Sequence, residues 1–282
     1  MYANAKGAPV KIPSYKTIQV TIENKVATLL LNRPEKKNAM SPQLHIDVAQ
    51  ALEDLRYRQD CTVLVITGAG NSFCAGMDLK EFFHELKGDK AEYDRIFRIA
   101  TEWRGRTLRQ FPKPVIAMIN GWCFGGAFSI VEGCDLAVAA DEAEFGLSEI
   151  NFRMFPGGVV SKSLARLMRP RDALLYAMTG RRFNGKQAEE MGWVNFSVPL
   201  ARLEAETMKL AAEMADKDPA ALRACKDAYY YSLEMPWDAA VSYAAAKEKE
   251  VFVAQGGAWL EQGVKDFVKG EYKPGLKAHG SK

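Results

Sequence analysis

The sequence has few of the residues that build metal and disulfide sites. Its three histidines are too few and too dispersed to predict a metal cluster. Its cysteines form an odd, scattered set without CxxC spacing, which favours free thiols over a disulfide framework or a zinc site. We therefore expect no bound metal and a reducing, cytoplasmic compartment. The residues in question are His45, His84, His279, Cys61, Cys74, Cys123, Cys134 and Cys225.

Long apolar runs and a strong charge surplus are also missing. No apolar run approaches the roughly 20 residues that cross a bilayer, and residues 1–14 lack the apolar core of a signal peptide. The net charge of +3 is small, and no Lys/Arg stripe with interleaved aromatics is present, which argues against nucleic-acid binding. We expect neither a nucleic-acid nor a membrane partner.

The pattern that is present is an alternation of strands and helices. It predicts an α/β fold with right-handed ββα-type crossovers and buried strands. Helices are expected at 41–56, where Ser41 and Pro42 form a start signal, and at 91–110. Strands are expected at 17–22, 26–31, 62–67, 114–119 and 135–140, with 144–149 as a further candidate.

The C-terminal part of the chain reads as helical from Arg171 onward. Broad apolar faces on such helices often pack on another subunit. We divide the chain into a loose N-terminal arm (1–15), a core (16–200) and a C-terminal helical region (201–282). The expected helices are 201–215, 219–233, 237–254 and 259–268.

Two glycine-containing loops, 75–78 and 124–128, follow expected strands. Small residues allow a ligand to approach the backbone closely, and a helix that begins in the second loop would expose free N–H groups. Two such amides converging on one carbonyl oxygen would stabilise an enolate. On spacing alone, the alternative of ordinary tight turns is favoured.

Glu149 lies in an apolar run, which makes it a candidate acid/base. Burial would raise the pKa of its carboxyl from roughly 4.3 toward the working range of such a group. The alternative, an exposed carboxylate at a strand end, has slightly more weight from local sequence. Asp78 is more simply read as a cap for a helix that begins near Leu79. No GxSxG elbow surrounds Ser129, which argues against a serine hydrolase.

Five runs together resemble the enoyl-CoA hydratase/isomerase (crotonase) superfamily. They occur in the family order at family-like spacing, and the resemblance covers about residues 17–270. The runs are NRPEKKNAM at 32–40, ITG at 66–68, FCAGMDL at 73–79, PVIAMING at 114–121 and FGLSEI at 145–150.

This resemblance implies a crotonase spiral of ββα units with a C-terminal α-helical oligomerisation region. It implies a homotrimer, or a hexamer built as a dimer of trimers. The backbone amides of Met77 and Gly126 would form the oxyanion hole for the thioester carbonyl. The residues that would line the coenzyme A path are Lys36, Ala75, Asp78 and Leu79.

Further features are similar to one branch, the hydroxycinnamoyl-CoA (feruloyl-CoA) hydratase-lyases. Ordinary hydratases carry a second glutamate three residues after the oxyanion-hole glycine, where this chain has Ser129. GWCFGG at 121–126 and KPGL at 273–276 also look like this branch. The similarity implies hydration of an aromatic enoyl-CoA and cleavage to a vanillin-type aldehyde and acetyl-CoA. Glu149 would be the acid/base, Ser129 would orient water or substrate, and no cofactor beyond coenzyme A would be needed.

The acyl pocket implied by this branch would include Phe82, Trp122, Arg153 and Tyr243. Better-known members have tyrosines that address the substrate phenol at the matches of Phe82 and Ala245. Two alternatives therefore remain open: a hydratase or isomerase acting on another acyl-CoA without C–C cleavage, and a non-catalytic acyl-CoA-binding protein. A dehalogenase is less favoured, because no aspartate nucleophile follows Glu149 closely.

Overall fold

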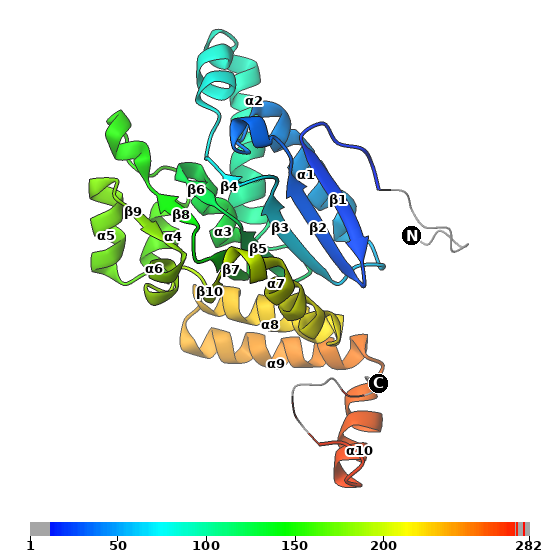
Figure 1. Cartoon of the computed structure of the whole chain (residues 1–282). Coiled ribbons are helices and arrows are strands. Elements are labelled where there is room, and N and C mark those ends of the chain that lie inside the picture. The colour runs from blue at the N-terminus through cyan, green and yellow to red at the C-terminus, as the bar shows by residue number, and fades with distance from the viewer. Residues whose placement is uncertain (1–11, 274, 276–278, 280–282) are drawn as a thin grey trace.

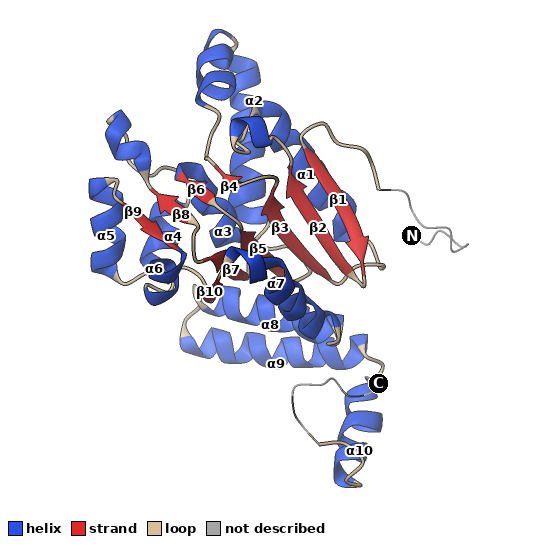
Figure 2. Cartoon of the chain, viewed as in Figure 1, coloured by secondary structure: helices blue, strands red, loops and turns tan. Residues whose placement is uncertain are grey.

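The computed structural model describes residues 12–273, 275 and 279, so most of the expected N-terminal arm lies outside the described residues. Two sheets and the helices around them make up the described chain (Figures 1 and 2). This is the mixed α/β architecture that the strand–helix alternation predicts. None of the described helices is both long enough and apolar enough to span a bilayer.

The larger sheet has the strand order β1-β2-β3-β5-β7-β10. Asn24 and Lys25 both have positive φ and join β1 to β2 as the expected hairpin turn. All other pairs in this sheet are parallel. The bounds are β1 Ile18–Glu23, β2 Val26–Leu31, β3 Val63–Gly68, β5 Val115–Ile119, β7 Leu136–Ala140 and β10 Phe196–Val198.

The core of the molecule lies on both faces of this sheet. Every residue of β3 is buried, as expected for a central parallel strand covered on two sides. α7 (Leu200–Ala215) packs on β3, β5 and β7, while α1 (Pro42–Arg56) packs on β1 and on α2 (Lys90–Glu102). The Ser41 hydroxyl accepts from the Leu44 amide at 3.2 Å, so α1 begins at the expected N-cap.

The smaller sheet has the order β4-β6-β8-β9, with β4, β6 and β8 parallel. Carboxyl ends of parallel strands meet at one edge of a sheet, which is where open α/β sheets place their ligand sites. The loops after β4, β6 and β8 lead to the three sequence regions expected to carry the chemistry. The bounds are β4 Ser72–Cys74, β6 Trp122–Phe124, β8 Glu144–Gly146 and β9 Arg182–Asn184.

The structure corrects two expectations. The strand expected at 144–149 ends at Gly146, and Ser148–Phe152 is a 3-10 helix (η6) that contains Glu149. The segment after Arg171 is not wholly helical, because β9 and β10 interrupt it. Both strands have three residues, too few to show a periodic pattern.

The remaining helices surround the sheets, and two of them, α8 and α9, form a layer below the sheets in Figure 1. α8 and α9 lie side by side, and α10 lies beyond them. The helix expected at 91–110 is split into α2 and a π-helical turn, η4. The bounds are η1 Pro34–Lys36, η2 Leu79–Glu85, η3 Leu86–Gly88, η4 Trp103–Thr107, η5 Gly125–Ala127, α3 Phe128–Gly133, α4 Val160–Leu167, α5 Pro170–Thr179, α6 Gly185–Glu190, α8 Pro219–Ser232, α9 Trp237–Ala254, η7 Trp259–Val264 and α10 Lys265–Val268.

Candidate active site

The loop after β4 presents a backbone amide at Met77. The Met40 amide donates to the Gly76 carbonyl at 2.8 Å, and the Asp78 amide donates to the Met40 carbonyl at 3.0 Å. These two bonds hold the loop in an extended conformation beside Met40. Among the described residues, no acceptor is found for the Met77 amide between them, so it is available to a ligand.

Asp78 holds the end of this loop. Its Oδ1 accepts from the amides of Lys80 and Glu81 at 3.2 and 2.9 Å, and its Oδ2 pairs with the Arg33 guanidinium at 3.1 Å. The capping role expected from sequence is confirmed by these bonds, although the helix that begins at Leu79 is a π-helix.

The loop after β6 packs directly on the first loop. A methyl group built on Gly76 would lie 2.7 Å from the Phe124 carbonyl oxygen and 3.4 Å from the Gly126 nitrogen, so only glycine permits this approach. The Gly126 amide lies in the first turn of η5, where helix amides lack partners. It too donates to no acceptor in the described part of the chain. The free amides of Met77 and Gly126 thus lie on two loops that pack against each other.

Glu149 faces the second of these loops. A methyl group built on Gly125, whose φ is +52°, would lie 3.0 Å from Glu149 Oε1, so the carboxylate lies against the bare backbone. Oε2 is buried and forms no hydrogen bond within the described residues. Burial raises the pKa of Glu149, and the residue's own amide opposes this effect. Such a carboxylate suits an acid/base role.

The main chain after Glu149 turns sharply. Its carbonyl accepts from the Met154 amide at 3.0 Å, and Arg153 adopts a left-handed φ of 61°. The Arg153 side chain is exposed. Its expected place in the acyl pocket stays a prediction.

Ser129 is buried in α3 and already has two partners. Its hydroxyl donates to the Gly126 carbonyl at 2.6 Å and accepts from Arg104 Nη1 at 3.1 Å. Ser129 therefore supports the glycine loop from behind. Arg104, in η4, was not identified from the sequence, because an arginine in a helical segment gives no signal of its contacts with Ser129 and Gly126.

The residues expected along the coenzyme A path lie in the first loop, at the start of η2 and in η1. Lys36 and Leu79 are exposed, and the Ala75 amide donates to the Lys37 carbonyl at 2.9 Å. Lys37 Nζ lies 3.6 Å from the centre of the Trp122 ring. Exposed ammonium groups suit phosphates, but the coenzyme assignment of these residues stays a prediction.

The residues of the expected acyl pocket contact different parts of the described chain, and the pocket stays a prediction. Phe82 is fully buried and packs on His45, with ring centres 5.5 Å apart. Trp122 stacks on Phe124 at 4.7 Å, beside the glycine loop. Tyr243 contacts Tyr231 within the α8–α9 layer, and no contact with the Glu149 region is found in the described residues of one chain.

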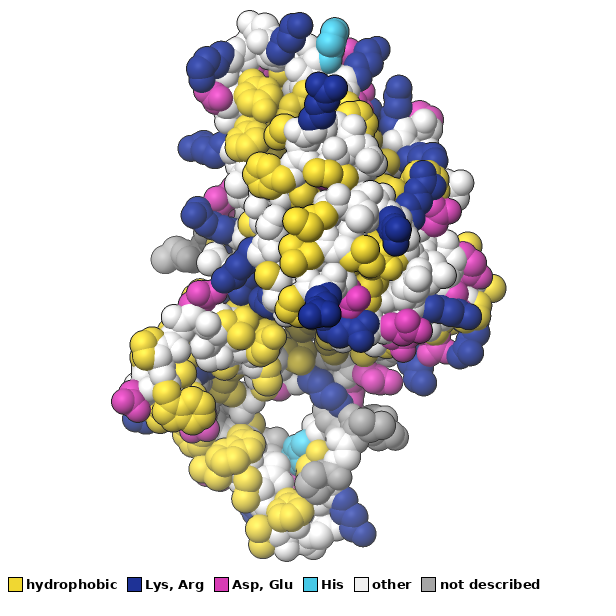
Figure 3. All heavy atoms as spheres, turned by 90° about the vertical axis from the view of Figure 1, so that its left-hand side faces the viewer, with side chains coloured by type: hydrophobic (Ala, Val, Ile, Leu, Met, Phe, Trp, Pro, Cys, Tyr) yellow, Lys and Arg dark blue, Asp and Glu magenta, His cyan; other side chains and the backbone are white. Residues whose placement is uncertain are grey.

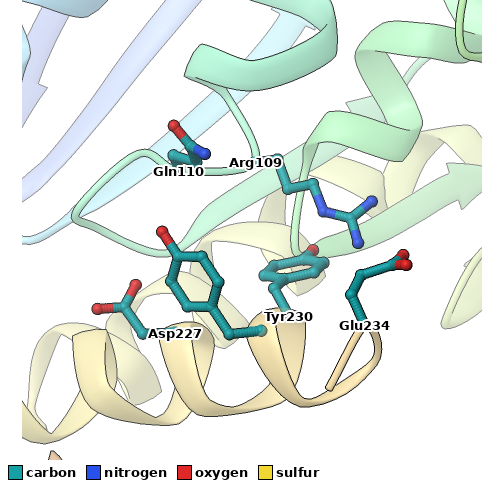
Figure 4. A pocket seen from close by; sticks show the side chains of 6 residues that line it. Arg109, Gln110, Asp227, Tyr230 and Glu234 are labelled. Atoms are coloured by element: carbon teal, nitrogen blue, oxygen red, sulfur yellow. The ribbon is translucent and has the colours of Figure 1, made fainter. Parts of the chain in front are cut away.

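A surface cavity of about 270 Å³ lies away from Glu149, between α8 and the segment that follows η4 (Figure 4). The Tyr230 ring lies below the Arg109 guanidinium at 4.6 Å and closes one side of the cavity. Nothing in this cavity resembles an acid/base paired with free amides. The lining residues are Arg109, Gln110, Asp227, Tyr230, Tyr231 and Glu234.

An exposed apolar face begins directly after Glu149. Figure 3 shows the side of the molecule that carries α5, with apolar side chains gathered between basic ones. Phe155 and Met178 are 65% and 69% exposed. Apolar side chains that are exposed together, rather than singly, are typical of an interaction surface. The exposed apolar residues of segment 150–178 are Ile150, Phe152, Met154, Phe155, Leu174, Leu175 and Met178.

Comparison with known proteins gives a consistent result. The sequence model of the enoyl-CoA hydratase/isomerase family matches residues 21–270. The hydroxycinnamoyl-CoA hydratase-lyase of Pseudomonas fluorescens is 46% identical over 269 residues, which are 94% of this chain and 97% of that protein.

Solved structures agree with the sequence comparison. An enoyl-CoA hydratase of Bacillus anthracis is 28% identical with a TM-score of 0.82, covering 93% of this chain and 99% of that one. An enoyl-CoA hydratase of Mycobacterium smegmatis is 26% identical with a TM-score of 0.83 and the same coverage. The chain belongs to the enoyl-CoA hydratase/isomerase family and has the crotonase fold.

Proposed function

We propose that this chain is a hydroxycinnamoyl-CoA hydratase-lyase that converts feruloyl-CoA-type thioesters to an aromatic aldehyde and acetyl-CoA. The observation that carries the proposal is the Glu149 carboxylate, which faces the loop with the free Gly126 amide, next to the loop with the free Met77 amide. Ser129 stands where hydratases carry a second glutamate. The 46% identity to the Pseudomonas fluorescens enzyme supports the same conclusion.

The first step is addition of water to the enoyl double bond. The thioester carbonyl binds the amides of Met77 and Gly126. Glu149, as carboxylate, takes a proton from water while the oxygen adds to the β-carbon. The resulting enolate is held by the two amides, and Glu149 returns the proton to the α-carbon. One acid/base is sufficient, because the same carboxyl accepts and then donates.

The second step is a retro-aldol cleavage. Glu149 removes the proton of the β-hydroxyl, the Cα–Cβ bond breaks, and the aldehyde leaves. The electron pair forms the enolate of acetyl-CoA in the same oxyanion hole, and Glu149 protonates its α-carbon. Both steps therefore use the same two amides and the same carboxyl.

The direct test is incubation of the purified protein with feruloyl-CoA. We expect loss of the conjugated thioester with vanillin and acetyl-CoA formed in equal amounts. A hydrated thioester without aldehyde would contradict the lyase assignment.

A hydratase acting on another acyl group is the second candidate. Phe82 is buried and has no hydroxyl to address a phenol, and the solved relatives are enoyl-CoA hydratases. A panel of aliphatic and aromatic enoyl-CoA thioesters separates the two candidates by the presence of aldehyde. Binding across the panel without any turnover would instead indicate a non-catalytic acyl-CoA-binding protein.

A further inference from the structure

Arg104 places a positive charge behind the glycine loops. Its Nε donates to the Ala100 carbonyl at 2.9 Å, and its Nη1 donates to Ser129 Oγ at 3.1 Å and to the Gly126 carbonyl at 3.4 Å. Arg104 forms no ion pair with any described residue. A guanidinium without a carboxylate partner at such a position is uncommon, because desolvation of a charge is costly unless it is paired.

The guanidinium lies beside Gly126, the residue at which the two loops of the candidate oxyanion hole meet. A methyl group built on Gly126 would lie 3.1 Å from Arg104 Nη1 and 3.3 Å from Met77 Cγ. On the other loop, burial raises the pKa of the Cys74 thiol to about 12, and the charge of Arg104 opposes that rise. Burial, and after it the positive charge of Arg104, keeps the pKa of His45 well below its usual value.

Arg104 stays protonated at neutral pH. Burial lowers its pKa to about 10, which is still far above physiological pH. His45 is neutral there, and its Nδ1 accepts from Trp103 Nε1 at 3.0 Å. Arg104 is therefore the charged member of this group of side chains.

We propose that Arg104 is an electrostatic component of the oxyanion hole, acting from behind Gly126 and stabilising the enolate of a bound acyl-CoA thioester. It acts through space and through the loop it supports, so it is a positioning residue. A fixed positive charge in a site of low dielectric favours a developing negative charge. The proposal rests on the proposed function only for the location of the oxyanion hole.

The serine at position 129 leaves the charge of Arg104 unpaired. A glutamate at that position would place its carboxylate against the Arg104 guanidinium and neutralise it. The serine hydroxyl contacts the guanidinium and leaves its charge in place. The charge is then available to the two enolates of a hydration–cleavage sequence.

The test uses acetoacetyl-CoA, which ionises to an enolate with its own near-ultraviolet absorbance and needs no turnover. The pH of half-ionisation of the bound ligand is measured for wild type, R104Q and R104K. R104Q keeps N–H donors but removes the charge. We expect it to raise this pH by on the order of one unit, a tenfold change in ionisation constant. R104K, which restores a charge, should recover most of the shift.

R106Q is the matched control, because Arg106 lies on the same turn but is exposed and paired with Glu102. An unchanged midpoint in R104Q, or an equal shift in R106Q, would overturn the proposal. Wild-type protein that binds acetoacetyl-CoA without ionising it would overturn it as well. R104M serves as a second neutral variant should R104Q not fold. Failure of the hydratase-lyase function appears separately, as absence of aldehyde from feruloyl-CoA.

Discussion

At the residue scale, Glu149 combines burial with the absence of a counter-charge. Its carboxylate is not stabilised by an ion pair or a side-chain hydrogen bond among the described residues. The folded state thus bears a cost for keeping it ionised, which the unfolded chain does not. This cost is the price of a base held ready beside two free amides.

Replacement of Glu149 by Gln should abolish most turnover and stabilise the fold. We expect kcat to fall by roughly 10² to 10⁴, the usual contribution of an acid/base, while acyl-CoA still binds. Since the folded pKa is raised, the ionised form destabilises the fold above that pKa, and the cost disappears as pH falls through it. E149Q should therefore unfold at higher urea than wild type at pH 7, with no advantage at strongly acidic pH. Equal midpoints at pH 7 would contradict this.

The pH dependence of wild-type activity follows from the same carboxyl. Hydration begins with ionised Glu149, so kcat/KM should fall on the acidic side. Because burial raises the pKa of Glu149, the midpoint should lie above the roughly 4.3 of a free glutamate. A pH–rate profile for the free enzyme measures it. A midpoint at or below the free value would argue against this carboxyl as the base.

Gly125 tests the contact between the loop and the carboxylate. Gly125→Ala forces a left-handed residue to carry a Cβ at 3.0 Å from Glu149 Oε1, so we expect activity to fall at least tenfold. The backbone strain alone should cost about 1–2 kcal/mol of stability. Gly158→Ala is the control, because Gly158 has a φ of +64° with no atom within 4 Å of a built Cβ. Equal activity losses would show that strain, not the carboxylate contact, is responsible.

At the element scale, sequence patterns predicted long elements well and short ones poorly. The strand Val26–Leu31 and the helix Trp237–Ala254 have the expected bounds, because each is long enough to show a pattern of residue types typical of a strand or a helix. The three-residue strands β4 and β6, which position both glycine loops, show none. Backbone amides carry no side-chain signal either. The residues indicated only two glycine loops that could present amides, and the assignment to Met77 and Gly126 came from resemblance to a family.

The cap at Asp78 connects the first glycine loop to the helix that follows it. Asp78→Ala removes both the helix cap and the carboxylate that pairs with buried Arg33. We expect a loss of about 0.5–2 kcal/mol from the cap alone, with a further loss because Arg33 would keep only Glu81 as its carboxylate partner. Asp78→Asn keeps a capping oxygen and should lose less. Urea midpoints that rank the two variants the other way would contradict the capping role.

At the scale of the whole molecule, Lys226 joins the C-terminal helices to the core. Its ammonium, on α8, contacts Asp135 Oδ2 at 2.9 Å and the carbonyls of Leu108 and Lys113 at 3.2 and 3.3 Å. Asp135 also accepts from the Val115 amide of β5 at 2.7 Å. One buried ion pair thus connects the helical layer to the larger sheet.

Removal of this ammonium should destabilise the protein strongly. Lys226→Met leaves Asp135 buried without its cation, a change that typically costs about 3–5 kcal/mol. The pKa of Asp135 is already raised by burial, and loss of Lys226 raises it further. Protonation then relieves the penalty, so the deficit should shrink as pH falls. Lys87→Met, in exposed η3, is the control and should have little effect in the same urea titrations.

The helical layer also leaves apolar side chains in water. Trp237, Val253 and Val268 are 82%, 77% and 77% exposed. Large exposed apolar surfaces are typical of protein–protein interaction sites. We propose that further copies of the chain cover these side chains in a homotrimer or hexamer. Light scattering on the wild-type protein should then give a mass of three or six chains.

Val253→Asp should lower that mass, because a buried unpaired carboxylate opposes association. Tyr57→Asp alters a residue that is 69% exposed directly after α1 and should leave the mass unchanged. A monomeric wild type would require another explanation for the exposed tryptophan and valines.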